Sequence, residues 1–398
     1  MIPRRKIHTI NRECYLALKT FFKKNVCFSE GIPELEKAFS RFIDVKHAIP
    51  VSSGRMGMKL ILESLELNKA DEVIIPAYTL KDLINLIQSL GLIPVPADIH
   101  PETFNIDPNS VAQRITNKTR VILATHLFGT PCQIDNIMQI ARDKSIFVIE
   151  DCAHSIGAQF NGRKTGCFGD ASFFSFETIK PVNAYGGGMV VTNDEGLARQ
   201  IRQKIIYCEN TSRIPIKKVM GAFLENLILP TPLSFPALYL LASEPWDKIM
   251  YNFYRKIQKS AGQIHPLTDF QAFIGLEKLK TLESRIFQRR KRADLFKILL
   301  KDKIRPQLIE DKISPNYYFF VALIPSGDVF KIRKFLLMHG IDAGVGAEIA
   351  DDCATFLKRA DCLNAQEVFR QVIHLPLHEG MSEHQIRYMA GVLGRLFP

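Results

Sequence analysis

The chain has 398 residues, of which 46% are hydrophobic and 23% are charged, and its formal net charge is +11. This length is enough to bury a large core and indicates two domains, and the composition is typical of a soluble globular enzyme. The eight cysteines show neither CxxC pairs nor metal-ligand spacing. This usage argues against a disulfide framework and favours reduced thiols in a cytoplasmic protein, and we expect no metal site.

The excess positive charge is concentrated in three segments, residues 4–6, 213–218 and 285–292. The simplest interpretation is a solvated surface that keeps the protein soluble. A phosphate-rich substrate or an anionic membrane would be attracted by the same charge. We expect no nucleic-acid partner, because no recognisable reading motif accompanies these residues. The N-terminal residues also lack the continuous apolar core of a secretory signal, so nothing indicates export.

Residues 1–30 are amphipathic and predict one or two helices, and the apolar spacing in residues 31–42 predicts another helix. A brief expected strand, residues 49–51, then runs into Ser53 and Gly54, and the apolar spacing from Met56 onward predicts a helix. A glycine turn that opens a helix presents unpaired backbone N–H groups and a positive dipole end. This turn is therefore a candidate phosphate site.

Short apolar runs and helical stretches alternate through the next part of the chain. The expected strands are residues 73–75, 94–97, 121–124 and 147–149, and the expected helices are residues 81–90, 109–114 and 134–144. Regular alternation of this kind predicts an α/β fold, a three-layer arrangement in which helices cover both faces of a mainly parallel sheet.

The stretch from residue 147 to residue 192 carries the side chains with the clearest chemistry. An apolar run ends in Glu150 and Asp151, and a second run, residues 171–176, is followed four residues later by Lys180. A glycine triplet then leads into a third run, residues 189–191. Side chains just past the ends of strands line the ligand crevice of an open α/β sheet. An acid and an amine placed there match the needs of pyridoxal phosphate, which takes an acid at its ring nitrogen and a lysine for covalent attachment.

Residues 214–254 form an unusually apolar segment that prolines interrupt. No run in it reaches the ~18 to 20 apolar residues that a membrane-spanning helix requires. Three interpretations are open: a packed insertion at a domain or dimer interface, an in-plane membrane contact or cover over a lipid-bearing substrate, and a mobile lid. The membrane interpretation would place the protein at the inner face of the membrane.

The C-terminal part predicts a smaller α+β domain. We expect helices at residues 267–300 and 329–339, a strand at residues 317–324, and further structure at residues 366–376 and 382–397; another helix, at residues 194–206, is expected in the preceding part of the chain. The helical spacing over residues 267–300 predicts a linker between two domains. The expected division is a large domain of residues 1–265 and a linker helix with a small domain in residues 266–398.

Several segments, in order along the chain, resemble the DegT/DnrJ/EryC1/StrS family of sugar aminotransferases. They are DEVIIPAYTL from residue 71, DIHPETFNID from residue 98, THLFG from residue 125, EDCAHSIGA from residue 150, SFETIK from residue 175, LTDFQAFIGLEKL from residue 267 and HLPLHEGMSE from residue 374. The resemblance runs from about residue 30 to the end. It implies the fold of type I pyridoxal-phosphate enzymes, pyridoxal 5'-phosphate as cofactor, and a homodimer in which two chains build each site.

The resemblance assigns roles to five residues around the cofactor ring. Lys180 matches the lysine that attaches the cofactor and then moves the proton between the substrate and cofactor carbons. Asp151 matches the acid that keeps the ring nitrogen protonated. Ala153 is small enough to lie against one ring face, and His154 matches a residue near the phenolic oxygen. Ser175 resembles the serine that donates to the cofactor phosphate.

Other matched positions depart from the family pattern. Ser53 and Gly54 match the phosphate turn, but Arg55 stands where the family favours threonine, and it either pairs with the phosphate or points away. Leu80 replaces the aromatic residue that usually stacks on the ring. The family's Asn and Arg before the TDFQA segment are absent from residues 262–266, and residues 344–348 replace its Tyr–Pro–Leu–His run. These departures predict retained cofactor chemistry and an unusual acceptor.

The leading hypothesis is therefore an aminotransferase that moves an amino group from glutamate to a keto-sugar linked to a nucleotide or a lipid. A dehydratase outcome is a weaker alternative, because the dehydratase relatives generally lack the lysine at position 180. A binding or regulatory protein of the same fold, associated with a membrane, is the alternative from another functional class. The changed substrate-side motifs and the apolar segment motivate it.

Overall fold

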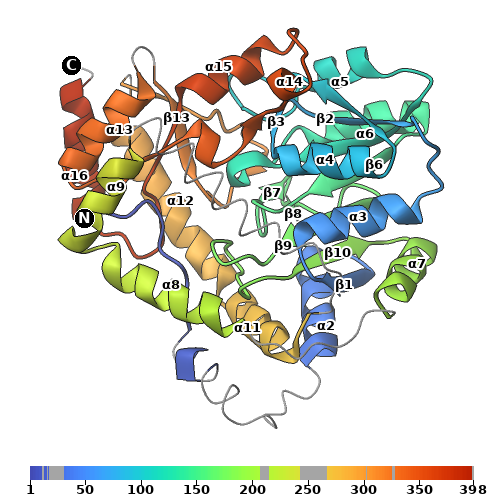
Figure 1. The fold of residues 1–398 in the computed structure, drawn as a ribbon, viewed down its shortest axis with the longest axis horizontal. Helices are drawn as coiled ribbons and strands as arrows, with labels where there is room; N and C mark the ends of the chain where they lie inside the picture. The colour runs from blue at the N-terminus through green and yellow to red at the C-terminus, as the bar shows by residue number, and fades with distance from the viewer. Residues whose placement is uncertain are drawn as a thin grey trace.

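The computed structural model describes residues 1–10, 13–15, 17, 31–206, 215–242, 267–301, 303–324 and 328–396. In Figure 1 a large sheet with its helices occupies the right-hand part of the molecule, and a smaller sheet with α13 and α16 occupies the left. The long helix α12 (Leu282–Leu299) runs between these two parts. Both chain ends lie on the side of the smaller sheet.

The large sheet has seven strands in the order β1-β10-β9-β6-β5-β2-β4. Their bounds are β1 His47–Val51, β2 Glu72–Pro76, β4 Ile93–Ala97, β5 Thr119–Thr125, β6 Phe147–Asp151, β9 Ala171–Ser175 and β10 Gly188–Thr192. The strands from β9 to β4 are parallel, and β10 runs antiparallel to both of its neighbours. The mainly parallel sheet that the alternating pattern predicts is confirmed.

Helices cover both faces of this sheet. Their bounds are α2 Gly31–Ile43, α3 Gly54–Ser64, α4 Lys81–Ser89, α5 Pro108–Arg114, α6 Ile134–Lys144 and α7 Glu195–Ile206. Val73 and Ile75 of β2 point into the core that α3, α4 and α7 cover, whereas Ile74 points into the opposite core, which α5 and α6 cover. Because neighbouring residues of a strand face opposite sides, the near-continuous apolar strands of this sequence require both layers.

The smaller sheet is antiparallel, with the strand order β11-β13-β16-β14. Its strands are β11 Arg305–Pro306, β13 Phe320–Leu323, β14 Gly344–Val345 and β16 Val372–Leu375, and it packs with α12, α13 (Val329–Met338) and α16 (Glu383–Leu396). Ile2 forms a bridge to Ile341 and is buried in this core, so the first residues pack with the C-terminal α+β unit. The domain boundary at residues 265 and 266 stays a prediction.

Two of the expected C-terminal elements differ in extent from the structure. The helix expected over residues 267–300 is two helices, α11 (Asp269–Lys280) and α12, which meet at Thr281. The strand expected from residue 317 begins only at Phe320. Tyr317 cannot belong to it, because its backbone is left-handed, with φ of 48°. The shorter elements are β3 Tyr78–Thr79, β7 Gln159–Phe160, β8 Arg163–Lys164, β12 Ile313–Ser314, β15 Asp351–Asp352, α14 Cys353–Phe356 and α15 Leu363–Gln371.

The described part of the apolar segment packs across the two units. Helix α8 (Ile216–Ile228) places Val219 and Ala222 in a small core with residues of the N-terminal segment and α11, and α9 (Phe235–Leu241) packs on α13. The outer face of α8 is apolar, with Phe223 and Leu224 each 49% exposed and Leu227 60% exposed. Residue 214 and residues 243–254 of this segment lie outside the described residues. Among those described, no helix is long and apolar enough to cross a membrane.

Candidate active site

Asp151 and Lys180 lie at the same edge of the large sheet. Asp151 is the last residue of β6 and pairs in register with Phe173 of β9, and Lys180 follows β9 in a turn in which its backbone N–H donates to Glu177. The two side chains lie close enough for each charge to shift the pKa of the other. The structure thus brings together the acid and the amine, which lie 29 positions apart in the sequence.

The surroundings of this pair shift their protonation equilibria in opposite directions. Burial lowers the pKa of Lys180 to about 8, although the Asp151 and Glu177 carboxylates oppose this shift. Burial raises the pKa of Asp151. Two smaller effects lower it: the N–H group of Ala153, which donates to Oδ1 over 2.9 Å, and the charge of Lys180. Near neutral pH a larger fraction of Lys180 is therefore the neutral amine that reacts with carbonyl groups than for an exposed lysine.

His154 lies beside the same pair and contacts a residue that the sequence did not identify. Its ring centroid is 4.6 Å from that of Tyr318, and Lys180 Nζ lies 4.7 Å from the Tyr318 centroid. Burial, and then the Lys180 charge, hold the pKa of His154 well below its ordinary value, so the ring is neutral. Tyr318 belongs to a YYFF run that predicts only a strand, and no local pattern links it to Lys180.

Asn316 fixes the relative position of His154 and Tyr318. Its Nδ2 donates to the carbonyl oxygen of His154 over 2.9 Å, and its Oδ1 accepts from the backbone N–H of Tyr318 over 2.8 Å. Gly129 packs so closely against Asn316 that a side chain there would overlap the amide oxygen. The residues from 316 to 318 therefore form a fixed wall of the site, which sequence reasoning missed.

Ser53, Gly54 and Ser175 lie together where β9 ends and α3 begins. Ser53 caps α3, because its Oγ accepts from the backbone N–H of Met56 over 3.1 Å. A Cβ atom at Gly54 would lie 3.3 Å from the Cβ of Ser175. The N-terminus of α3 and the Ser175 side chain therefore meet. Backbone N–H groups and a hydroxyl at a helix N-terminus suit a phosphate group.

Arg55 and Leu80 lie near the start of two neighbouring helices. Arg55 Nη1 is 2.6 Å from Asp82 Oδ2, so its charge already has a carboxylate partner on α4. Leu80 directly precedes α4 and packs, partly buried, against the core of the large sheet. Their assignment to the cofactor stays a prediction.

Glu150, the other half of the acidic pair, has a structural role. Its carboxylate accepts from His126 Nε2 and from the backbone N–H groups of Gly166, Phe168 and Gly169 over 2.8–2.9 Å. Burial alone would raise its pKa, but these donors hold the pKa of Glu150 below its ordinary value. Ligand atoms of His126, Glu150 and Cys152 lie within 4.8 Å of one another, yet the hydrogen bonds of the first two residues are satisfied within the protein.

Two buried polar atoms near Asp151 show that the site has unused hydrogen-bonding capacity. Thr125, which pairs with Asp151 across β5 and β6, has a buried Oγ1 without a hydrogen-bond partner among the described residues, and the same holds for His154 Nδ1. Buried polar groups in proteins are rarely left unsatisfied. A ring with polar substituents that reached Asp151 would fit these groups, so the residues present are compatible with pyridoxal phosphate.

The replaced substrate-side motif lies in the smaller unit. Glu348 forms ion pairs with Arg4 and Arg333, at 2.9 Å for the second pair, and its Oε2 is 3.6 Å from His374. This segment therefore ties the N-terminal residues to α13 and β16. The other replaced segment, residues 262–266, lies outside the described residues.

Comparison with known proteins gives matches over nearly the whole chain. The DegT/DnrJ/EryC1/StrS aminotransferase family matches residues 23–393. The uncharacterized protein MJ1066 of Methanocaldococcus jannaschii is 30% identical over 369 residues, which cover 89% of this chain and 86% of that protein. The GDP-perosamine synthase of Escherichia coli O157:H7 is 39% identical over 166 residues, so the match spans 42% of this chain and less than half, 46%, of the synthase.

Solved structures agree on the fold. The aminotransferase TlmJ from Streptoalloteichus hindustanus superimposes with a TM-score of 0.78 at 20% identity, with 100% of both chains covered. DesI, solved in the presence of its TDP-sugar product, gives a TM-score of 0.75 at 23% identity and covers 99% of this chain and 91% of its own. At these identities the likeness concerns the fold. With the family match, it shows that the chain belongs to the DegT/DnrJ/EryC1/StrS aminotransferase family.

Proposed function

We propose that this protein is a pyridoxal-phosphate-dependent aminotransferase that moves the amino group of glutamate to a keto-sugar carried by a nucleotide or a lipid. The observation that carries this proposal is the buried pair of Lys180 and Asp151 at one edge of the sheet, with the pKa of the amine lowered to about 8. The sugar acceptor is supported by relatives such as the GDP-perosamine synthases and by DesI with its TDP-sugar product.

Bound pyridoxal phosphate would supply an aldehyde that accepts the amino group and a ring that withdraws electrons from the attached substrate carbon. Asp151 would hold a proton at the ring nitrogen, and Ala153 would lie against a ring face. The N-terminus of α3 at Ser53 and Gly54, together with Ser175, would hold the phosphate.

Lys180 carries the proton transfers. Its Nζ would remove the proton from the substrate carbon that bears the nitrogen, and it would return a proton to the corresponding carbon of the acceptor. The pKa of about 8 lets one group act in both directions near neutral pH. His154 and Tyr318 exclude water from one side of the amine. In the first half-reaction glutamate gives up its amino group and a water molecule supplies the keto oxygen of 2-oxoglutarate. In the second half-reaction the amino group replaces the keto oxygen of the sugar, which leaves as water, so the reaction consumes and releases one water molecule.

We also propose that two chains associate through the outer face of α8 and α9. The support is the group of exposed apolar side chains, which is larger than an isolated surface residue would explain: Phe223, Leu224, Leu227, Ile228, Leu233 and Leu240. A homodimer is what the family resemblance implies. Light scattering should give twice the chain mass, and Leu224→Asp should reduce it to the monomer. A monomeric wild-type protein that sediments with anionic vesicles would instead assign this face to a membrane.

The half-reaction with glutamate tests the function. The absorbance of the cofactor-loaded protein should change when glutamate is added, and 2-oxoglutarate should appear in an amount that matches the protein. Lys180→Ala should abolish this conversion, whereas Lys217→Ala, which removes an exposed lysine of α8, should not. Production of 2-oxoglutarate at the wild-type rate by Lys180→Ala, or none by the wild-type protein, would overturn the proposal.

A further inference from the structure

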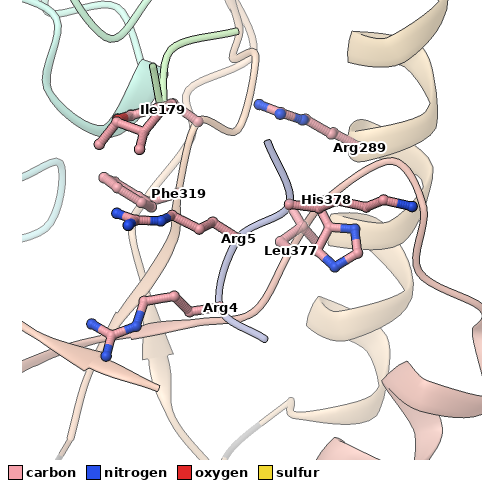
Figure 2. Close-up of a pocket in the computed structure, with 9 residues that line it drawn as sticks. Arg4, Arg5, Ile179, Arg289, Phe319, Leu377 and His378 are labelled. Atoms are coloured by element: carbon pink, nitrogen blue, oxygen red, sulfur yellow. The ribbon is translucent and has the colours of Figure 1, made fainter. Parts of the chain in front are cut away.

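Two of the three basic segments in the sequence converge on one recess beside the active site. Residues 4–6 and Arg289 of α12 line it together with Ile179, Tyr318 and His378, and its cavity volume is only about 20 Å³. Figure 2 shows Arg289 reaching from its helix toward Ile179, while the N-terminal segment with Arg4 and Arg5 runs between that helix and Phe319. The recess suits a single small group rather than a whole nucleotide.

Two buried side chains in this recess have unused nitrogen atoms. Arg289 is 8% exposed, and its Nε donates to Glu379 Oε2 over 2.9 Å, but its buried Nη1 has no hydrogen-bond partner among the described residues. His378 is 6% exposed, and its Nδ1 is also buried without such a partner. An unsatisfied buried donor, above all a charged one, is costly. A hydrogen-bond acceptor beside each of these nitrogen atoms would satisfy it.

The recess also carries more positive charge than its own carboxylate neutralises. Glu379 is the carboxylate next to Arg289, and it lies 3.7 Å from Arg285 as well. Burial, opposed by Glu379 and reinforced by the Arg289 charge, lowers the pKa of Arg285 to about 10. Lys6 adds a further charge that acts on His378. Arg4 and Arg5 are paired with other carboxylates, so the surplus comes from Arg285, Arg289 and Lys6.

Direct contacts connect this recess with the turn that carries Lys180. Ile179, which precedes the lysine, lines the recess, and Arg285 Nη1 donates to the carbonyl oxygen of Pro181, which follows it, over 2.8 Å. Tyr318 borders the recess and also lies 4.7 Å from Lys180 Nζ. An anion in the recess would therefore belong to a molecule whose other part reaches the active site.

We propose that the recess formed by Arg289, His378 and Lys6 is a subsite for a phosphate group of the sugar acceptor's carrier. A phosphate offers several acceptor oxygens and a negative charge, which match an unpaired guanidinium nitrogen, an imidazole and an amine. Both candidate carriers, a nucleoside diphosphate and a lipid diphosphate, share this chemistry. The identity of the bound molecule as the acceptor rests on the proposed function, whereas phosphate binding itself does not.

Calorimetric titration of the cofactor-loaded protein tests the subsite with three probes: inorganic pyrophosphate, UDP and farnesyl diphosphate. In the loaded protein the phosphate site at Ser53 and Gly54 is already filled. Pyrophosphate should bind, and Arg289→Gln should weaken its binding at least about tenfold, because a charge-assisted hydrogen bond is lost. Lys291→Gln, which removes the same charge from an exposed position on α12, should change it less than about twofold.

The other two probes distinguish the carriers. UDP that binds more tightly than pyrophosphate supports a nucleotide carrier, and farnesyl diphosphate that binds more tightly supports a lipid carrier. If Arg289→Gln does not fold, Lys6→Gln at an exposed residue replaces it, with an expected loss of several-fold. Absence of binding by the wild-type protein, or unchanged binding by the folded variant, overturns the subsite.

The glutamate half-reaction of the same samples separates this inference from the proposed function. Phosphate binding without conversion of glutamate contradicts the aminotransferase assignment and leaves the anion subsite standing. Conversion of glutamate without phosphate binding contradicts only the subsite.

Discussion

Glu150 and Asp151 are neighbours in the chain, and the structure predicts effects of very different size on stability for the same change at each position. Glu150→Gln should lower the free energy of unfolding by about 3–5 kcal/mol, because it breaks a buried charged network. Asp151→Asn should lower it by less than about 1 kcal/mol. Both changes turn a carboxylate into an amide of nearly the same size, so volume does not explain the difference.

The magnitude at Glu150 follows from its partners. Oε2 accepts from the N–H group of Gly166 and from Nε2 of His126, both over 2.9 Å. The Nε2 atom of His126 cannot become an acceptor for the amide at low cost. The proton would have to move to Nδ1, which already accepts from the backbone N–H of Cys132. An amide NH₂ group at the Oε2 position would face two donors. Each buried hydrogen bond that is lost in this way costs about 1–3 kcal/mol, and more where a charge is involved.

The carboxylate of Asp151 is in a different position. Its one hydrogen bond among those described is accepted by Oδ1 from the N–H group of Ala153, and an asparagine oxygen can accept it equally well. Burial also raises the pKa of Asp151, so a neutral group is no worse suited to this position in the cofactor-free protein. The carboxylate is needed only when a ring nitrogen is present.

Urea unfolding of the cofactor-free proteins, followed by far-ultraviolet circular dichroism, measures both effects. Glu150→Gln should unfold at a clearly lower urea concentration than the wild-type protein, and Asp151→Asn at nearly the wild-type concentration. In the cofactor-loaded form, Asp151→Asn should lose activity while it remains folded. Equal destabilisation by the two variants, or a larger effect at Asp151, would refute this division of roles.

Three other predictions concern titration and buried charge. The rate at which pyridoxal phosphate attaches to the cofactor-free protein should rise with pH through about 8, because attachment needs the neutral amine of Lys180; a rate independent of pH in stopped-flow absorbance would contradict this. Lys278→Met leaves the carboxylate of Glu13 buried without its partner at 2.5 Å, so it should lower the free energy of unfolding in urea by about 3–5 kcal/mol. Adding Glu13→Gln should restore most of this loss, and a double variant no more stable than the single one would contradict the prediction. Burial lowers the pKa values of His8 and His378 from 6.5 to about 4, so their contribution to stability is fully present above pH 6.5 and is lost as the pH falls toward 4. His378→Phe should therefore reduce the drop in melting temperature between pH 6.5 and pH 4, and an unchanged drop would contradict this.

The large sheet and its helices could be predicted from local pattern. Short apolar runs alternate with helical spacing from residue 73 to residue 149, and the strands and helices of the structure follow these runs with small differences at their ends. The positions of Asp151 and Lys180 also followed from pattern, because residues just past the ends of parallel strands share one edge of a sheet. An acid and an amine at that edge already matched pyridoxal phosphate, and the family resemblance assigned the role of each residue.

Contacts between distant segments could not be predicted in this way. Tyr318 meets His154 and Lys180 only because Asn316 fixes the chain before β13, and a YYFF run carries no sign of that contact. The convergence of residues 4–6 with Arg289 depends on the N-terminal segment packing against the smaller sheet, where Ile2 bridges to Ile341. Charge clusters in a sequence show how many basic residues there are, but not which of them become buried together.

The central claim is that the amine of Lys180 and the acid of Asp151 serve one molecule of pyridoxal phosphate. Reduction of the cofactor-loaded protein with borohydride, followed by digestion and mass spectrometry, tests it most directly. The cofactor mass should appear on the peptide that contains Lys180, and it should disappear in Lys180→Ala. Cofactor attached to another lysine, or no attached cofactor in the wild-type protein, would contradict the claim.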